Sequence, residues 1–373
     1  MGLKRDQLLA ILVLLPSILL IALFVYGFIG NTVYVSMTDW GKNAALAFNP
    51  EKNFVGFKNY GDLFSGFLNG RFRQDLVNAI FYSFFLVFGS LIFGLFLAIL
   101  LDRNPKGERF FQTIFLFPLS LSFIVSGTIW RWLLAPDGGI NVLPVFIGLP
   151  KLEFRWLSSL ETVMQFNWQN MPQFLVFLIS LILIVLSLFV LDKGSGKLWI
   201  VLLTGGIFLF LLGIFGKEYL PTVLMMEEIH GFNLATIGII IAAVWQYSGY
   251  TMALFLAGLR GISKDLVNAA RLDGASEWQY YWRIAVPLLK PITLSAVIIL
   301  SHISLKIFDL IFAMTGPDNV EAGHPSLLMY LTTFRANDFA KGAAIAVILF
   351  ILAAVFIIPY IISSYQGRKA AEL

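Results

Sequence analysis

The chain has 373 residues, of which 58% are hydrophobic and only 13% are charged. A soluble domain usually carries about 25% charged residues, so this composition and a mean hydropathy of +0.83 exclude an ordinary soluble protein. The net charge of +4 does not indicate nucleic-acid binding, because lysines and arginines in membrane-protein loops mainly set orientation. The chain has no cysteine, which excludes disulfides and thiolate metal sites.

Apolar runs long enough to cross a bilayer core of ~30 Å as a helix recur along the sequence. We therefore predict an all-α, polytopic membrane protein with about eight transmembrane helices, forming one domain over residues 1–373. The predicted spans are 8–30, 78–101, 110–134, 173–191, 198–215, 234–259, 291–313 and 343–365. The first is interpreted as a retained helix, because its apolar run exceeds the roughly 7–15 residues of a signal-peptide core.

An even number of spans places both termini on one side of the membrane. Basic residues concentrate on that side, around the termini and at 102–109, 192–197 and 260–290. The positive-inside rule makes this side cytoplasmic. The segments 31–77 and 135–172 are then expected to be long extracytoplasmic loops.

The longest predicted cytoplasmic loop, 260–290, has the pattern of two short helices. Ser263 suits the N-cap of the first helix, and Gly274 suits its end in a left-handed conformation. Ser276 and Gln279 have the spacing of a capping box that begins the second helix. The loop is thus predicted to be a helix pair with a tight bend at the glycine.

The second helix of this pair is predicted to carry one apolar, aromatic face. Its members are Trp278, Tyr281, Trp282 and Ala285. From the residues alone, two interpretations stay open. The helix pair either rests on lipid headgroups or docks into a cytoplasmic partner.

The stretch NAARLDGASEWQYYWRIAVPLLKP, which begins at residue 268, resembles the EAA loop of ABC-importer permease subunits. That pattern is Glu-Ala-Ala, three residues, Gly, nine residues, Ile-x-x-Pro. The resemblance implies that the loop forms a coupling helix that inserts into an ATPase subunit. The implied coupling residues are Asn268, Ala269, Ala270, Asp273, Gly274, Ala275, Ile284 and Pro287. Asn268 departs from the pattern, because the family usually has Glu there, so an ionic contact with the ATPase is not implied at this position.

Further segments are similar to the carbohydrate-importer branch of this family, the relatives of the maltose permease. They are WQYSGYTMALFLAGLRGI (245–262), FDLIFAMTGP (308–317), LVNAIFYSF (76–84) and WRWLLAPDGGIN (130–141). The resemblance implies a type I ABC-importer permease core. Residues 160–233 fall outside it and are interpreted as an insertion with two extra spans.

The resemblance also implies the function and the partners. The chain would be the permease subunit of an ATP-driven importer for a sugar or glucoside in a bacterial inner membrane, coupled to ATPase subunits through residues 264–285. The implied partners are a second related permease, an ABC ATPase dimer, an extracytoplasmic solute-binding protein, the lipid bilayer and the sugar, with no nucleic acid. The sequence has no Gly-x-x-x-x-Gly-Lys-Ser/Thr motif, so ATP and Mg would be bound by the ATPase subunits.

No catalytic or metal-binding constellation is predicted, and the chain is not expected to be an enzyme. The three histidines, His230, His302 and His324, are too few and too scattered for a metal site. No cofactor is expected in this chain.

Polar groups inside a bilayer are costly and usually face a bundle interior or a watery cavity. Polar and aromatic residues within the predicted spans are therefore candidates for the substrate pathway. They are Asn78, Tyr82, Trp245, Gln246, Tyr247, Tyr250, His302, Lys306 and Asp309. The last three are predicted to share one helical face, where Lys306 and Asp309 can pair. Ordinary packing, or a pair that neutralises itself, remains the alternative.

Two other classes of function are alternatives for this sequence. An ion-coupled secondary transporter of small polar solutes would need buried acids for its coupling ion. Only Asp309 lies clearly within a predicted span, which argues against this class. A non-transporting membrane scaffold remains the second alternative.

Overall fold

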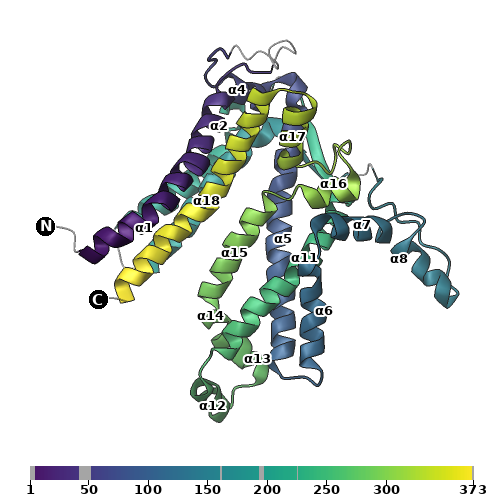
Figure 1. Ribbon diagram of the computed structural model, residues 1–373, viewed down its shortest axis with the longest axis vertical. Helices are drawn as coiled ribbons and strands as arrows, with labels where there is room; N and C mark the ends of the chain where they lie inside the picture. The colour runs from purple at the N-terminus through teal and green to yellow at the C-terminus, as the bar shows by residue number, and fades with distance from the viewer. Residues whose placement is uncertain (1–4, 42–51, 160–161, 193–196, 225, 372–373) are drawn as a thin grey trace.

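The computed structural model describes residues 5–41, 52–159, 162–192, 197–224 and 226–371. Two long helices, α5 (Gly70–Asp102) and α11 (Leu234–Arg260), pack against each other at its centre (Figure 1). Gly94 makes their close approach possible, because a Cβ at this position would overlap the Oγ1 of Thr251. The Thr251 hydroxyl donates to the Ser90 carbonyl at 2.6 Å and so joins the two helices.

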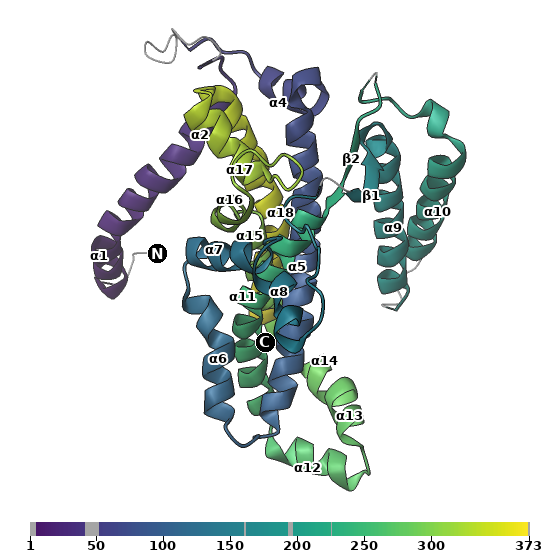
Figure 2. The same cartoon turned by 90° about the vertical axis from the view of Figure 1, so that its right-hand side faces the viewer.

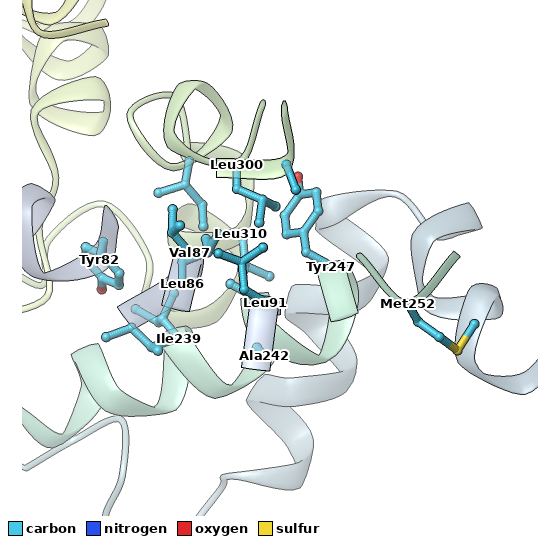
Figure 3. Close-up of a cluster of buried hydrophobic side chains, with 14 of the residues drawn as sticks. Tyr82, Leu86, Val87, Leu91, Ile239, Ala242, Tyr247, Met252, Leu300 and Leu310 are labelled. Atoms are coloured by element: carbon cyan, nitrogen blue, oxygen red, sulfur yellow. The ribbon is translucent and has the colours of Figure 1, made fainter. Parts of the chain in front are cut away.

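The hydrophobic core lies where these two helices meet α15 (Lys290–Ser304) and α16 (Asp309–Thr315) (Figure 3). Leu86, Leu300 and Leu310, from three different helices, are fully buried there. In a bilayer, close packing holds helices together, because lipid is as apolar as leucine. The interlocked side chains therefore fix α15 and α16 on the central pair.

The predicted third span, 110–134, is wrong as a single helix. It consists of α6 (Glu108–Ser120) and α7 (Phe123–Leu133), which are bent by 103° at a short break. The Ser122 hydroxyl begins the second helix by accepting a hydrogen bond from the Val125 amide. At 1.5 Å per residue, neither helix exceeds about 20 Å, so neither crosses the bilayer core alone.

The predicted seventh span, 291–313, is also broken. α15 ends at Ser304, residues 305–308 form a turn, and α16 begins at Asp309. Before it, the helical segment Glu277–Leu288 meets α15 at an angle of 65°. After α16 the chain enters a loop at 316–324 and continues as α17 (Pro325–Tyr330).

The N-terminal helices lie at the edge of the molecule. α1 (Arg5–Ile21) continues through a π-helical turn into α2 (Phe28–Ser36), which packs on α18 (Phe339–Ala371). In Figure 2, α1 diverges from all other helices. Between α2 and α5 lies α4 (Lys58–Ser65), and residues 42–51 of the predicted loop 31–77 are outside the described part.

The described residues between 162 and 233 form a helical hairpin on a small two-stranded sheet, within an otherwise helical fold. Strands β1 (Thr162–Asn167) and β2 (Ile229–Asn233) pair antiparallel and flank α9 (Met171–Asp192) and α10 (Leu198–Phe215). Figure 2 shows the two helices beside each other and apart from the core. Most of the predicted turn at 192–197 lies outside the described residues, since 193–196 are not placed.

The two hairpin helices pack on each other. The Ser180 hydroxyl donates to the Gly206 carbonyl at 2.8 Å, and the Gln173 side-chain amide donates to the Gly213 carbonyl at 2.9 Å. Leucine, isoleucine and phenylalanine cover their other faces, and many of these side chains are exposed. The surface of the hairpin therefore suits contact with lipid.

Each of the eight predicted spans contains a helix, but fewer pass as spans by length and composition. Four do so among the described residues, and each bent pair, if counted as one span, raises the number to six. The four are Leu12–Ser36, Phe67–Asp102, Leu198–Phe215 and Leu234–Arg260. Two shorter apolar helical stretches are Trp168–Ile184, which begins in the turn before α9, and Phe339–Val355 in α18.

Candidate functional site

The predicted helix pair of the cytoplasmic loop is confirmed. α12 (Lys264–Leu272) begins with Ser263, whose hydroxyl accepts the Leu266 amide at 3.4 Å. α13 (Glu277–Tyr280) begins with the capping box between Ser276 and Gln279, in which each side chain accepts the backbone amide of the other residue. Both caps were readable from the sequence because they depend only on neighbouring residues.

The bend between the two helices is set by backbone conformation. Gly274 has φ +78°, in the left-handed region that glycine adopts without strain. The Ala275 amide donates to the Ala270 carbonyl at 3.0 Å, which closes the end of α12. No atom lies within 4 Å of the place where a Cβ of residue 274 would sit. A side chain would therefore fit, but the conformation would be strained.

The predicted common face of the second helix is wrong. Tyr281 and Ala285 are buried, whereas Trp278 and Trp282 are 71% and 47% exposed and pack on each other. A π-helical turn over Tyr281–Ala285 interrupts the regular spacing that the prediction assumed. One side of this segment thus faces the protein and the other side is uncovered.

The residues implied in ATPase coupling differ in their exposure. Asn268, Ala269, Asp273 and Gly274 are exposed at the tip of the pair, while Ala270 is buried. Ile284 is half-buried, and Pro287 is exposed in the short helix α14 (Val286–Leu288). Asn268 and Ala275 line a cleft of about 630 Å³, together with residues of the turn between α5 and α6.

Three of the predicted pathway residues surround one cavity. Tyr247, midway along α11, lines a space of about 150 Å³ with Lys306, Asp309 and Phe123. The ring centroids of Phe123 and Tyr247 are 6.0 Å apart. The cavity therefore combines an aromatic wall with one charge of each sign.

The predicted ion pair between Lys306 and Asp309 is not formed. Both side chains are exposed, and within the described part of the chain neither makes an ion pair within 4.0 Å. The prediction assumed one continuous helix, but the turn at 305–308 separates the two residues. Their polar groups are thus open to a ligand.

A second, almost entirely apolar cavity of about 450 Å³ lies between α15, α17 and α18. Lys306 and Phe308 border both cavities, and His302 and Tyr330 line the second. His302 Nδ1 is buried and has no hydrogen-bond partner among the described residues. His302, Lys306, Ser326 and Tyr330 are the residues with polar side-chain groups among those that line this mostly apolar cavity.

Asn78 and Tyr82 line neither cavity. Both are fully buried on α5. The Asn78 side chain donates to the carbonyls of Glu321 and Gly323 at 2.9 and 3.0 Å, and the Tyr82 hydroxyl donates to that of Ala322 at 3.4 Å. In this conformation they hold the 316–324 loop against α5.

Trp245, Gln246 and Tyr250 also lie outside both cavities. The Gln246 amide donates to the Leu121 carbonyl at 3.2 Å, at the break between α6 and α7. Trp245 packs edge-on against Trp130, with ring centroids 5.8 Å apart. Because a break exposes backbone carbonyls, the glutamine stabilises the bent geometry.

A buried polar cluster joins α5 to the start of β2. No local sequence pattern predicted it. The guanidinium of Arg73, fully buried, donates to both carboxylate oxygens of Glu228 and to the Leu63 and Gly66 carbonyls. His230 Nε2 lies 2.6 Å from Glu228 Oε1. Burial alone would raise the pKa of Glu228, but the hydrogen bonds with Arg73 and His230 hold it below its usual value. Burial lowers the pKa of His230.

Residues 196–370 match the family described as binding-protein-dependent transport system inner membrane component. The chain is similar to a probable ABC transporter permease protein of Pyrococcus horikoshii, with 33% identity over 361 residues and 96% of each chain covered. It is also similar to the xylose/arabinose import permease of Haloferax volcanii, with 28% identity over 93% of this chain and 85% of that protein.

The fold is similar to a solved structure. A bacterial ABC transporter involved in the import of the acidic polysaccharide alginate superposes with a TM-score of 0.63, 18% identity, and coverage of 98% of this chain and 96% of that one. At this identity the likeness concerns the fold.

Proposed function

Because this chain belongs to the permease family of binding-protein-dependent ABC transporters, we propose that it forms half of the membrane pathway of a sugar importer. Membership makes it a multi-pass membrane transport subunit without an ATPase domain. Family membership argues against the two alternative functions, an ion-coupled secondary transporter and a non-transporting scaffold. The other half of the pathway would come from a second permease.

Sugar as the substrate is supported by the relatives and by the cavity. Relatives include the glucose import permease of Saccharolobus solfataricus and the trehalose/maltose permease of Thermococcus litoralis, 27% and 25% identical. A sugar hydroxyl both donates and accepts hydrogen bonds, so Lys306 can donate to one and Asp309 can accept from another. The Tyr247 ring can pack on the C–H face of the sugar.

The single observation that carries the pathway is the exposure of Lys306 and Asp309 without an ion pair in the described chain. Charged side chains in membrane segments face a bundle interior or a water-filled space, not lipid. A second permease placed over this face would enclose them in an aqueous path. The other predicted pathway residues would shape that path indirectly, through loop and helix packing.

Coupling to ATP hydrolysis is assigned to α12 and α13. The exposed tip at Asn268, Ala269 and Gly274 suits insertion into a partner, and the rigid caps hold its shape. Two ATPase subunits, which bind ATP and Mg, would drive the pair of permeases through such loops. Asn268 would contribute a hydrogen bond in place of an ionic contact.

The orientation follows from the same assignment. With α12 and α13 at the cytoplasmic face, both termini are cytoplasmic, and the segments 31–77 and 135–172 face outward. There they would receive a solute-binding protein loaded with sugar. The hairpin within 160–233 would add two peripheral spans to the rest of the permease.

The test measures ATP-driven sugar uptake in proteoliposomes that contain the complete importer. Lys306→Gln and Asp309→Asn each remove one charged hydrogen bond, so the uptake KM should rise about tenfold or more. Lys290→Gln, at the exposed start of α15, is the matched charge control and should leave KM unchanged. Unchanged KM in both pathway variants would contradict the assigned site. Uptake by the chain without any ATPase subunit would contradict the function itself.

A further inference from the structure

The cytoplasmic end of α5 is joined directly to the coupling segment. The Tyr281 hydroxyl donates to Oδ2 of Asp102, the last residue of α5, at 2.8 Å. Tyr281 is only 6% exposed, and its hydrogen bond with Asp102 is partly buried. The neighbouring pair Arg103–Glu277, at 2.8 Å, has side chains 52% and 63% exposed. Exposed pairs contribute little, so the tyrosine is the main contact between the two segments.

The opposite end of α5 holds the extracytoplasmic 316–324 loop. One face of the helix donates four side-chain hydrogen bonds to this loop, from Arg71, Asn78 and Tyr82. The Arg71 guanidinium reaches the Pro317 carbonyl at 2.9 Å. All the acceptors are backbone carbonyls. The contacts therefore hold the backbone of the loop and not only its side chains. A movement of α5 would move the loop with it.

Between these two ends α5 is a continuous α-helix of 33 residues without proline. At 1.5 Å per residue it is about 50 Å long. The neighbouring paths are interrupted, because α6 and α7 meet at 103° and the coupling segment meets α15 at 65°. A break absorbs a displacement, whereas a continuous helix passes it on. The hydrogen bond from Thr251 to Ser90 also ties α5 to α11, which continues into the coupling loop.

We propose that α5 is the rigid connector that carries movement of the coupling segment to the 316–324 loop, and that Tyr281 is the positioning residue through which the movement enters. The inference rests on the proposed role of α12 and α13. Through α5 the cytoplasmic surface would be linked directly to the extracytoplasmic surface. This link would act in addition to the helices that follow the coupling segment in the sequence. A solute-binding protein docked outside would sense the ATPase state through this helix.

The first test compares sugar uptake with ATP hydrolysis in the complete importer. Tyr281→Phe and Asp102→Ala should each lower the sugar imported per ATP roughly tenfold, the factor for one charged hydrogen bond. The double variant should be no worse than either single one, because both remove the same bond. Asp102→Asn should stay near wild type, since its amide oxygen still accepts the hydroxyl. Arg103→Ala, in the same turn, is the control for a general disturbance.

The second test observes the loop itself. Asp318 is 94% exposed, and the chain has no other cysteine, so Asp318→Cys gives a single labelling site for a fluorophore. ATP should change its emission in the wild-type background and fail to do so with Tyr281→Phe. An unchanged response together with normal uptake per ATP would overturn the inference. If the wild-type complex hydrolyses ATP without importing sugar, the proposed function fails instead.

Discussion

His324 illustrates how far a single residue depends on its surroundings. It lies at the end of the 316–324 loop and is fully buried. Its Nδ1 accepts the Ser326 amide at 3.2 Å and so caps α17. Because Nδ1 is the acceptor, the neutral ring carries its proton on Nε2, which is buried without a partner in the described structure. A second proton would have to bind Nδ1, where it would remove the cap and leave a buried charge without water. Burial accordingly lowers the pKa of His324 to about 3.

The depressed pKa of His324 predicts a loss of stability in acid. At pH values between the ordinary histidine pKa of about 6.5 and the lower pKa of the folded state, His324 is protonated in the unfolded chain but neutral in the folded chain. The free energy of unfolding therefore falls as pH falls through this range. The loss should be about 2 kcal/mol at pH 5. His324→Asn keeps a good N-cap but does not titrate. Melting temperatures in detergent at pH 7.5 and pH 5 should therefore differ less for the variant; an equal pH dependence would contradict the burial argument.

Lys306 and Asp309 show where residue-level prediction fails. Their types and positions in an apolar region correctly marked them as unusual. Their supposed contact assumed an uninterrupted helix, and nothing in the residues 305–308 announced the turn with a proline or a glycine. The hydrogen bonds of Asn78 and Tyr82 were also hidden from the sequence, because the loop that accepts them lies far along the chain. Their place in the substrate pathway stays a prediction.

Among the elements, the helix pair α12–α13 was the most predictable. Its caps and its bend are local: serine hydroxyls accept amides three positions away, and a glycine takes the left-handed conformation. The broken helices were less predictable. In α6 and α7, Ser122 is a cap in the middle of an apolar run, where hydropathy alone predicts continuity.

Gly274→Pro should separate ATP hydrolysis from uptake. Proline fixes φ near −65° and cannot adopt the observed +78°, so the bend must rearrange and displace the tip of α12. Gly274→Asn is the matched control, since asparagine tolerates the left-handed conformation. We expect strongly reduced uptake per ATP with proline and near-normal coupling with asparagine, while both insert into the membrane. Normal uptake by the proline variant would rule out a role for the bend.

At the scale of the whole molecule, the hairpin α9–α10 behaves as a separate unit. Its helices pack on each other, and the connection to the core runs through β1, β2 and the buried contact of Arg73 with Glu228. Gln173 and Gly213, near its two ends, are hydrogen-bonded, so the ends are close together. A short linker can therefore replace it.

Replacing residues 171–215 with a glycine-serine linker should leave the rest of the chain folded. The melting temperature in detergent and the copurification with ATPase subunits should match those of the full chain. By contrast, Glu228→Leu leaves the fully buried Arg73 without its partner and should cost about 3–5 kcal/mol. If the linker variant is the less stable of the two, the hairpin is part of the core and not a peripheral unit.

The sequence by itself determined the membrane class, the approximate places of the helices, the capped pair with its glycine bend, and the family. These depend on hydropathy, which is summed over a window, and on caps and turns, which involve near neighbours. The tertiary structure decided the breaks at 121–122 and 305–308, the division of the 277–285 segment into a buried and an exposed side, and the partners of Asn78, Arg73 and Tyr281. Those features depend on contacts between segments up to about 250 residues apart, whose geometry no local pattern encodes.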